Sequence, residues 1–144
     1  MKNRVMYLAF PLALLLSCHS GPTEETQQAE LQGNVMAIHD AAMAKMEDIF
    51  KLRRSLRALR DTLEAQQADS TTLLVLQRDI SGLNEADEVM MSWMRQYQAP
   101  DSLQHQEAMA YLQAELQKIE RVQTVMDSTI QAARTTLTQY DQQK

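Results

Sequence analysis

Apolar residues recur every three or four positions through most of this chain, and that spacing predicts long amphipathic helices. The pattern continues through three stretches, at about 34–67, 71–98 and 102–141, with rare charged interruptions such as Lys45 and Asp87. The 144 residues include three glycines and three prolines, so few positions would break a helix. No part of these stretches alternates apolar and polar residues as a half-buried strand does. The sequence therefore predicts an all-α fold.

The apolar positions form a heptad-like seam, which is typical of helices that pack as coiled coils. The seam residues are Val35, Ile38, Ala42, Ile49, Leu52, Leu56, Leu59, Leu63, Leu73, Leu76, Ile80, Leu83, Met90, Met94, Tyr97, His105, Met109, Leu112, Leu116, Ile119, Gln123, Met126, Ile130, Ala133, Leu137 and Tyr140. Short connections between the stretches make neighbouring helices antiparallel. We therefore expect residues 34–144 to form an antiparallel three-helix, up-down-up, coiled-coil-like bundle. A long two-helix hairpin with a third arm is the alternative.

Polar residues mark the expected helix starts. Asn34, which follows Gly33, is the expected N-cap of the first helix. Asp69 or Ser70 is expected to cap the second helix, and Asp101 the third.

The third helix is expected to be longer than the second. Counting along antiparallel helices from a turn near residue 100 leaves residues from about 130 onward without a partner in the second helix. Ile130, Leu137 and Tyr140 would then be exposed unless something covers them. We therefore expect a second copy of the chain or a helical partner protein at that end.

The N-terminus has the pattern of an export signal. Lys2 and Arg4 precede an apolar stretch at 5–17, which is too short to span a bilayer of about 30 Å. The sequence "LLSC" at 15–18 resembles a bacterial lipobox. The resemblance implies cleavage before Cys18 and acylation of that cysteine, and two or more acyl chains anchor a protein stably. A plain signal peptide with an incidental cysteine is the alternative.

The lipobox resemblance fixes an expected organisation. Residues 1–17 would be the signal peptide, residues 18–33 the lipidated cysteine and a polar tether, and 34–144 the bundle. The protein would be anchored to a membrane of the cell envelope, with the outer membrane favoured, and its domain would lie in the periplasm or at the surface. Acylation of Cys18 would leave neither a free thiol nor a disulfide, so packing must provide the stability.

The charge of the chain argues against a nucleic-acid partner. After loss of Lys2 and Arg4, the chain has 12 basic and 19 acidic residues, a net charge of −7. One local exception is a basic helix face made by Lys51, Arg53, Arg54, Arg57 and Arg60. We interpret this face as solvated and paired with acidic neighbours, and we expect Arg53 or Arg54 to pair with Asp87.

Methionine and histidine residues form a possible metal site. In antiparallel helices, residues equally far from the connecting turn lie side by side. With turns near residues 69 and 100, this pairing brings two methionine-rich windows to one end of the bundle, near Trp93. Thioether and imidazole ligands suit Cu(I), and bacterial periplasmic copper proteins have similar sets of residue types. A core rich in methionine is the other interpretation, because methionine fills irregular gaps and packs against aromatic rings. The candidate ligands are His39, Met43, Met46, Met90, Met94 and His105.

The sequence has no pattern typical of catalysis. It contains no Ser–His–Asp constellation and no glycine-rich phosphate loop, and its single cysteine is the expected acylation site. We therefore expect a protein that is not an enzyme and needs no cofactor, with copper(I) as the alternative.

Two segments resemble a known group of proteins. "HDAAMAKMEDIFKLRRSL" (39–56) and "DEVMMSWM" (87–94) are similar to stretches of small helical lipoproteins of Bacteroidota, which are often labelled viral A-type inclusion protein. Members of this group have proline at the position of Ala44. The resemblance implies an envelope lipoprotein and supplies no activity and no binding residues.

Overall fold

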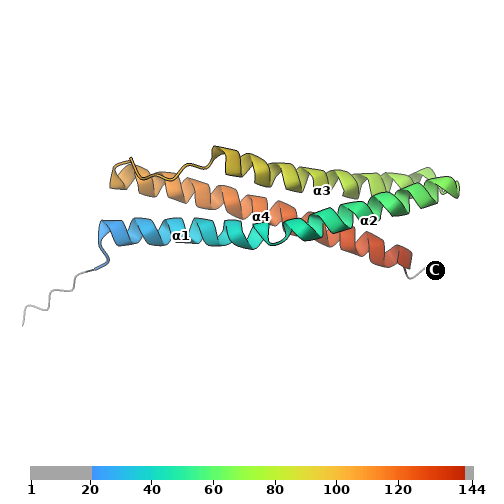
Figure 1. Ribbon diagram of the computed structural model, residues 1–144, viewed down its shortest axis with the longest axis horizontal. Coiled ribbons are helices and arrows are strands. Elements are labelled where there is room, and N and C mark those ends of the chain that lie inside the picture. The colour runs from blue at the N-terminus through green and yellow to red at the C-terminus, as the bar shows by residue number, and fades with distance from the viewer. Residues whose placement is uncertain (1–20, 142–144) are drawn as a thin grey trace, which may run out of the picture.

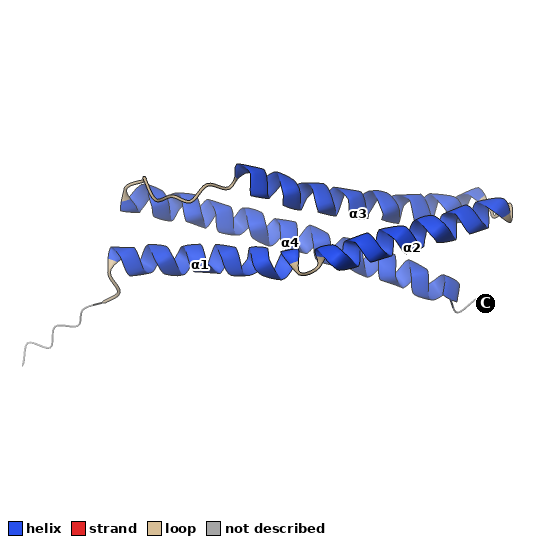
Figure 2. Cartoon of the chain, viewed as in Figure 1, coloured by secondary structure: helices blue, strands red, loops and turns tan. Residues whose placement is uncertain are grey.

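The computed structural model describes residues 21–141, which fold into four helices joined by short irregular segments (Figure 2). The helices are α1 (Glu24–Met43), α2 (Met46–Ala65), α3 (Ser70–Gln96) and α4 (His105–Asp141). Figure 1 shows that α1 and α2 follow each other along one arm, α3 returns beside α2, and α4 runs in the direction of the first arm. The expected all-α, up-down-up bundle is therefore confirmed, with its first arm made of two helices.

The first arm breaks at Ala44 and Lys45, so the prediction of one continuous helix at 34–67 is wrong. The backbone N–H of Ala44 still donates to the backbone carbonyl of Asp40 at 3.0 Å, and that of Lys45 donates to the carbonyl of Ala42 at 2.9 Å. Lys45 interrupts the apolar seam, and its ammonium reaches Asp127 on α4 at 2.5 Å. The break therefore lies where a long cation would otherwise have occupied a core position.

α1 begins earlier than expected, which corrects the predicted tether at 18–33. The Thr23 hydroxyl accepts a hydrogen bond from the Thr26 N–H at 3.2 Å and caps the helix. Glu24 and Glu25 occupy the first turn, where the helix dipole favours acidic side chains. Residues 24–33 are therefore helix, and Cys18 with the signal segment lies outside the described residues.

The tight turn between α2 and α3 uses a left-handed residue. Gln67 has a φ of 57°, and the Ala68 N–H donates to the Leu63 carbonyl at 2.9 Å, as in a helix C-cap motif. Asp69 then accepts a hydrogen bond from the Thr72 N–H at 3.0 Å and caps α3, which confirms the expected N-cap.

The connector at 97–104 moves α4 out of its expected register. Tyr97 is extended, and the Gln98 N–H donates to the Tyr111 hydroxyl at 2.9 Å. The chain therefore runs on beyond the end of α3 before α4 begins beside the start of α1 (Figure 1). The shift pairs the C-terminal part of α4 with α3, where Thr136 donates to Asp79 at 2.5 Å. Ile130 is buried as a result, so the predicted uncovered end of the third helix is wrong.

The core lies between the three arms and contains most of the expected seam, but Met94 is exposed and His105, Met109 and Gln123 are half-buried. The largest fully buried side chains are Ile49, Leu56, Leu76, Leu83, Met90, Leu112, Ile119 and Met126. Gly82 brings α3 close to α4, because a Cβ at this position would lie 3.1 Å from Cγ2 of Thr129. Within residues 21–141, no helix combines the length and apolar character needed to cross a bilayer.

Candidate functional site

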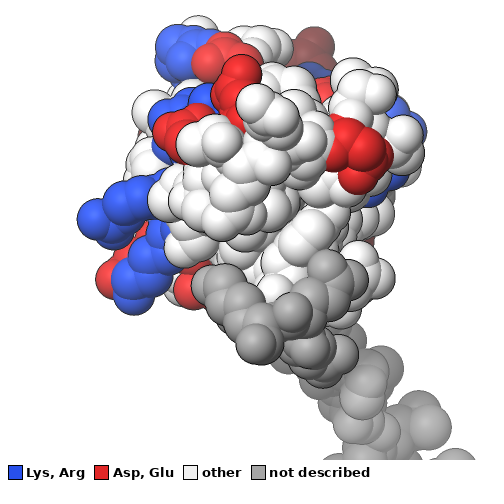
Figure 3. Space-filling view, turned by 90° about the vertical axis from the view of Figure 1, so that its right-hand side faces the viewer, with Lys and Arg blue, Asp and Glu red and all other residues white. Residues whose placement is uncertain are grey.

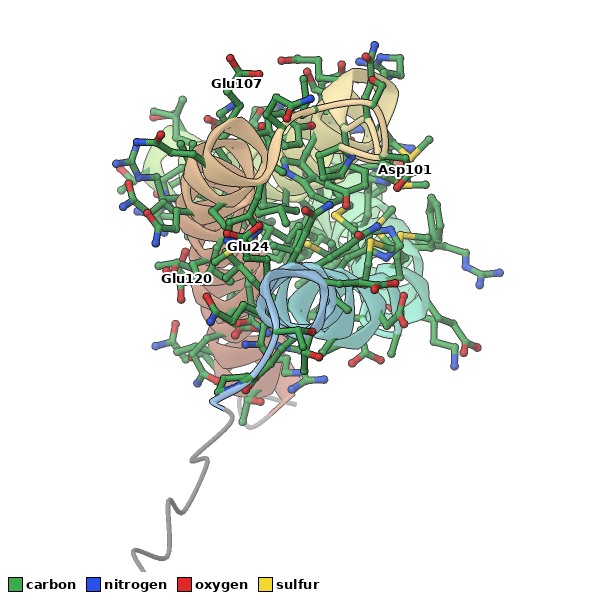
Figure 4. The ribbon with its side chains drawn as sticks, turned by 90° about the vertical axis from the view of Figure 1, so that its left-hand side faces the viewer. Glu24, Asp101, Glu107 and Glu120 are labelled. Carbon is green, nitrogen blue, oxygen red and sulfur yellow. The ribbon has the colours of Figure 1, made fainter. Side chains whose placement is uncertain are left out.

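Five of the six expected metal ligands lie around the junction of α1, α2 and α3. Figure 4 looks along the bundle from the end where α1 begins and shows most sulfur atoms on the side of these three helices. Met90 is fully buried and Met46 nearly so, whereas Met43 is half-buried and Met94 is 39% exposed. The cluster therefore extends from the core to the surface.

His39 is held in a defined orientation within this cluster. Its Nδ1 lies 2.9 Å from Oδ1 of Asp40, and because a carboxylate only accepts, Nδ1 carries the proton in this contact. Its ring centroid lies 5.5 Å from that of Trp93. In the neutral tautomer with the proton on Nδ1, the lone pair is on Nε2, which is the arrangement that metal-binding histidines use.

Aromatic side chains continue inward from His39. Trp93 stacks on Tyr97 with their centroids 4.9 Å apart, and Tyr97 lies 6.3 Å from Tyr111. Trp93 Nε1 and the Tyr97 hydroxyl are buried without a hydrogen-bond partner among the described residues. Burial raises the pKa of the Tyr97 phenol. The aromatic row thus joins α3 to the connector and to the start of α4.

His105 does not belong to this cluster, which corrects the predicted site. It lies where α1 and α4 begin, and its Nδ1 is buried without a partner in the described part of the chain. Gln32, beside His105, precedes His39 by seven residues, or roughly 10 Å along α1. His105 lines a shallow pocket of about 500 Å³ with Glu24, Glu25, Gln28, Ala29, Gln32 and Asp101.

The end of the bundle around His105 is acidic. Residues 21–44 and 96–117 contain seven Asp and Glu and no Lys or Arg. Figure 4 shows Glu24, Asp101 and Glu107 at this end of the molecule. No set of three His, Asp or Glu side chains within residues 21–141 is arranged to hold a metal ion.

The outer side of the α2–α3 hairpin has exposed apolar side chains and basic residues. Of the five large apolar side chains that are exposed within residues 21–141, four lie on these two helices: Phe50, Leu74, Met91 and Met94. Segment 49–60 contains five Lys and Arg and no Asp or Glu. Figure 3, which views the bundle from the end where α2 meets α3, shows most of the visible Lys and Arg side chains along one side.

Some of these cations are paired within the hairpin. Arg53 donates to Asp87 at 3.1 Å, which confirms the expected pair, and to Asn84 at 3.0 Å. Its guanidinium also lies 5.0 Å from the centroid of the Phe50 ring. Arg54 and Arg57 are exposed and form no salt bridge with another described residue.

A groove follows the same hairpin toward its tip. It has a volume of about 410 Å³ and is lined by Arg60, Glu64, Ser70, Leu73, Leu74 and Gln77. Arg60 donates to Gln77 at 3.1 Å across the groove. The sequence reasoning treated the basic face as solvent-exposed and missed this surface. Phe50 and Leu74, two large apolar residues outside the seam, were the signal that could have indicated it.

The buried carboxylates of Asp79 and Glu115 are engaged in structural contacts. Asp79 contacts Arg78 at 3.0 Å and accepts the hydroxyl of Thr136, and Glu115 pairs with Lys118 at 2.7 Å. These carboxylates join neighbouring turns or helices and do not line a common cavity.

Comparison of the chain with protein-family models, with curated proteins and with solved structures finds no match. The functional argument therefore rests on the residues and their geometry.

Proposed function

We propose that this protein is a lipid-anchored helical bundle of the bacterial cell envelope that acts as a non-enzymatic structural or interaction module. The observation that carries the proposal is the lipobox-like "LLSC" at 15–18, which follows a short apolar stretch and two cations. The similarity of segments 39–56 and 87–94 to Bacteroidota lipoproteins supports it.

The position of α1 supports a bundle held close to the membrane. Glu24, the first residue of α1, follows Cys18 by six positions. An acylated Cys18 would therefore hold the acidic end, where α1 and α4 begin, nearest the bilayer. α1 has 20 residues and is roughly 30 Å long, so α2 and the tip of the hairpin would project away from the membrane.

The anchor can be tested by metabolic labelling with a fatty-acid probe. We expect the wild-type chain to be labelled and to fractionate with membranes. Cys18→Ser should lose the label and remain uncleaved or become soluble. Ser17→Ala is the matched control, because it keeps a small residue before the scissile bond and should still be labelled. Label retained on Cys18→Ser would contradict the proposal.

The non-enzymatic part of the proposal is supported by how the polar side chains are used. Asp79, Glu115 and their partners join helices or turns, and the aromatic row around Trp93 packs three elements together. Both arrangements serve packing and leave the exposed hairpin surface as the chemically distinctive feature.

The geometry of His39 favours Cu(I) binding as a second candidate function. Its contact with Asp40 engages Nδ1, so Nε2 is the nitrogen that a metal would use, and Met43 lies one turn along α1. Met94 from α3 would supply a second accessible thioether. The donor set is soft, so Cu(I) should bind in preference to Zn(II).

Competition with a chromophoric Cu(I) chelator tests this second candidate. The triple variant Met43→Leu, Met46→Leu and Met94→Leu should keep the fold, because Leu and Met have similar volumes and each swap usually costs less than about 1.5 kcal/mol. Its Cu(I) affinity should collapse, whereas Met109→Leu on α4 should have no effect. A wild-type chain that cannot compete with micromolar chelator would rule out the site.

A further inference from the structure

We propose that the outer face of the α2–α3 hairpin binds an acidic amphipathic helix of a partner protein. The hairpin face is defined here as Phe50, Arg54, Arg57, Leu74, Met91 and Met94 together with the groove beside Leu73. This inference rests on the proposed function, because it names the partner of an interaction module.

Apolar side chains occupy both ends of the hairpin face. Phe50 is 49% exposed, and Met91 and Met94 are 38% and 39% exposed, near the start of α2. At the other end Leu74 is 68% exposed beside the groove. Exposed apolar patches on soluble domains mark interaction sites, and methionine adapts its shape to a partner surface.

The length and shape of the face suit a helix. Phe50 and Glu64 are fourteen residues apart on α2, which corresponds to roughly 21 Å or about four helical turns. α2 and α3 pack side by side along this length, so a helix laid along the hairpin could contact both the Phe50 end and the groove beside Leu74. This is the helix-in-groove mode of recognition, in which apolar residues at i, i+3, i+4 and i+7 face the groove.

The charge of the face specifies an acidic partner. Phe50, Arg54 and Arg57 are at positions i, i+4 and i+7, so they share one stripe of α2. Arg53 and Arg60 already contact Asp87 and Asp61. Arg54 and Arg57 have no salt bridge within the described residues, so glutamates flanking an apolar stripe would give them partners.

A partner protein fits the face better than the bilayer or a second copy does. With Cys18 anchored, the length of α1 would hold the start of α2 roughly 30 Å from the membrane. α1 of a second copy carries Glu24, Glu25 and Glu30, but its apolar side is packed within its own bundle through Val35 and Ala42.

The experiment measures binding of designed peptides to the full-length chain by fluorescence anisotropy. The probe is a labelled 18-residue helical peptide with leucine on one face and glutamate on the others, and the comparison peptide has lysine in place of every glutamate. We expect the acidic peptide to bind at least tenfold more tightly. Its affinity should fall on raising the salt concentration from 0.05 to 0.5 M, because salt screens exposed charges. Equal binding of the two peptides would overturn the proposal.

Variants assign the binding to the hairpin face. Arg54→Glu with Arg57→Glu, and separately Phe50→Ser with Met94→Ser, should each weaken the acidic peptide at least tenfold while circular dichroism and the melting transition show a folded chain. The matched control is Arg121→Glu with Leu103→Ser, which changes exposed residues outside the hairpin and should leave binding unchanged.

Three further results would contradict the inference. The first is an equal loss of binding in the control variant. The second is self-association of the wild-type chain that Arg54→Glu with Arg57→Glu abolishes, because the face would then bind a second copy. The third is displacement of the peptide by anionic lipid vesicles with no effect of neutral ones. Fatty-acid labelling of Cys18 is independent of all three, so failure of this inference is distinguishable from failure of the proposed anchor.

Discussion

The helices α1 and α3 differ sharply in how they join the bundle. α1 has 20 residues, of which Val35 and Ala42 are buried, whereas α3 has 27 residues and buries seven. The apolar seam runs through α3 but covers α1 only from Val35 onward, and α3 packs between α2 and α4 whereas α1 packs mainly on α4. A heptad pattern therefore indicates which face of a helix is inward, and the number of neighbouring helices decides how much of that face is buried.

The surfaces of the two regions also differ, in the sign of their charge. The end where α1 and α4 begin has acidic side chains and no Lys or Arg, whereas α2 has the basic stripe beside exposed Phe50. The predictions below test whether stability resides chiefly in the hairpin region.

The largest effect is expected at Leu56 in α2. Leu56→Asp would place a carboxylate at a fully buried position with no partner, which should destabilise the fold by more than about 4 kcal/mol. Circular dichroism and thermal melting of the purified chain measure this. Leu74→Asp is the control at an exposed position of the same hairpin, and its melting temperature should change little. A melting temperature of Leu56→Asp equal to that of the wild type would show that Leu56 is not buried in the core of the hairpin region.

A direct comparison of the two regions comes from Leu83→Ala in α3 and Val35→Ala in α1. Both positions are fully buried. Leu83→Ala should cost about 2–5 kcal/mol, because a cavity remains between three helices. Val35→Ala removes two carbons, or roughly 1.6 kcal/mol of burial at ~0.8 kcal/mol each. Urea unfolding measures both, and an equal or larger loss for Val35→Ala would contradict the comparison.

The break in the first arm shows what a periodic pattern can and cannot predict. Lys45 was recognisable as an interruption of the seam, but a long helix can tolerate one polar residue on its inner face. The break also depends on Asp127, which lies on α4 and accepts the Lys45 ammonium. A contact between residues so distant in the chain has no signature in the local sequence.

The start of α1 was predictable in principle. Pro22, Thr23 and the two glutamates that follow are ordinary helix-start residues, and Thr23 does cap the helix. The signal at Gly33 and Asn34 competed with them, although a glycine on the exposed side of a helix costs only about 1 kcal/mol relative to alanine. Helix starts that rest on capping alone are therefore ambiguous where the apolar pattern is weak.

The grouping of the candidate ligands was predictable in part for a related reason. His39, Met43, Met46, Met90 and Met94 were placed together because a tight turn joins α2 and α3, and antiparallel counting works across such a turn. His105 was misplaced because the connector at 97–104 is extended, so the position of α4 depends on contacts such as Gln98 with Tyr111.

A smaller effect on the free energy of unfolding is expected at Gln67, in the turn between α2 and α3. Gln67 has positive φ, which costs an ordinary residue more than glycine, so Gln67→Gly should stabilise the fold by about 0.5–1 kcal/mol. Gln66→Gly is the matched control, because Gln66 has a φ of −86° and glycine there only adds freedom to the unfolded chain. Urea unfolding should place the two variants on opposite sides of the wild type. A loss of stability in Gln67→Gly would show that the tip does not adopt this turn.

The smallest effect distinguishes the N-caps of α1 and α3. Thr23 caps α1 with a hydroxyl, which does not titrate, whereas Asp69 caps α3 and its pKa lies below the usual value because the Thr72 hydroxyl and N–H donate to it. A carboxyl whose pKa is lowered on folding stabilises the fold above its unfolded pKa, near 3.8, and this contribution is lost as the pH falls through the lower folded value. Melting of the wild type and Asp69→Asn should therefore differ at pH 6 and converge toward pH 2, because the amide cannot gain the charge-dependent part. Thr23→Ala should lower the melting temperature by the same amount at both pH values. A pH-independent difference between wild type and Asp69→Asn would show that the charge of Asp69 does not contribute to capping α3.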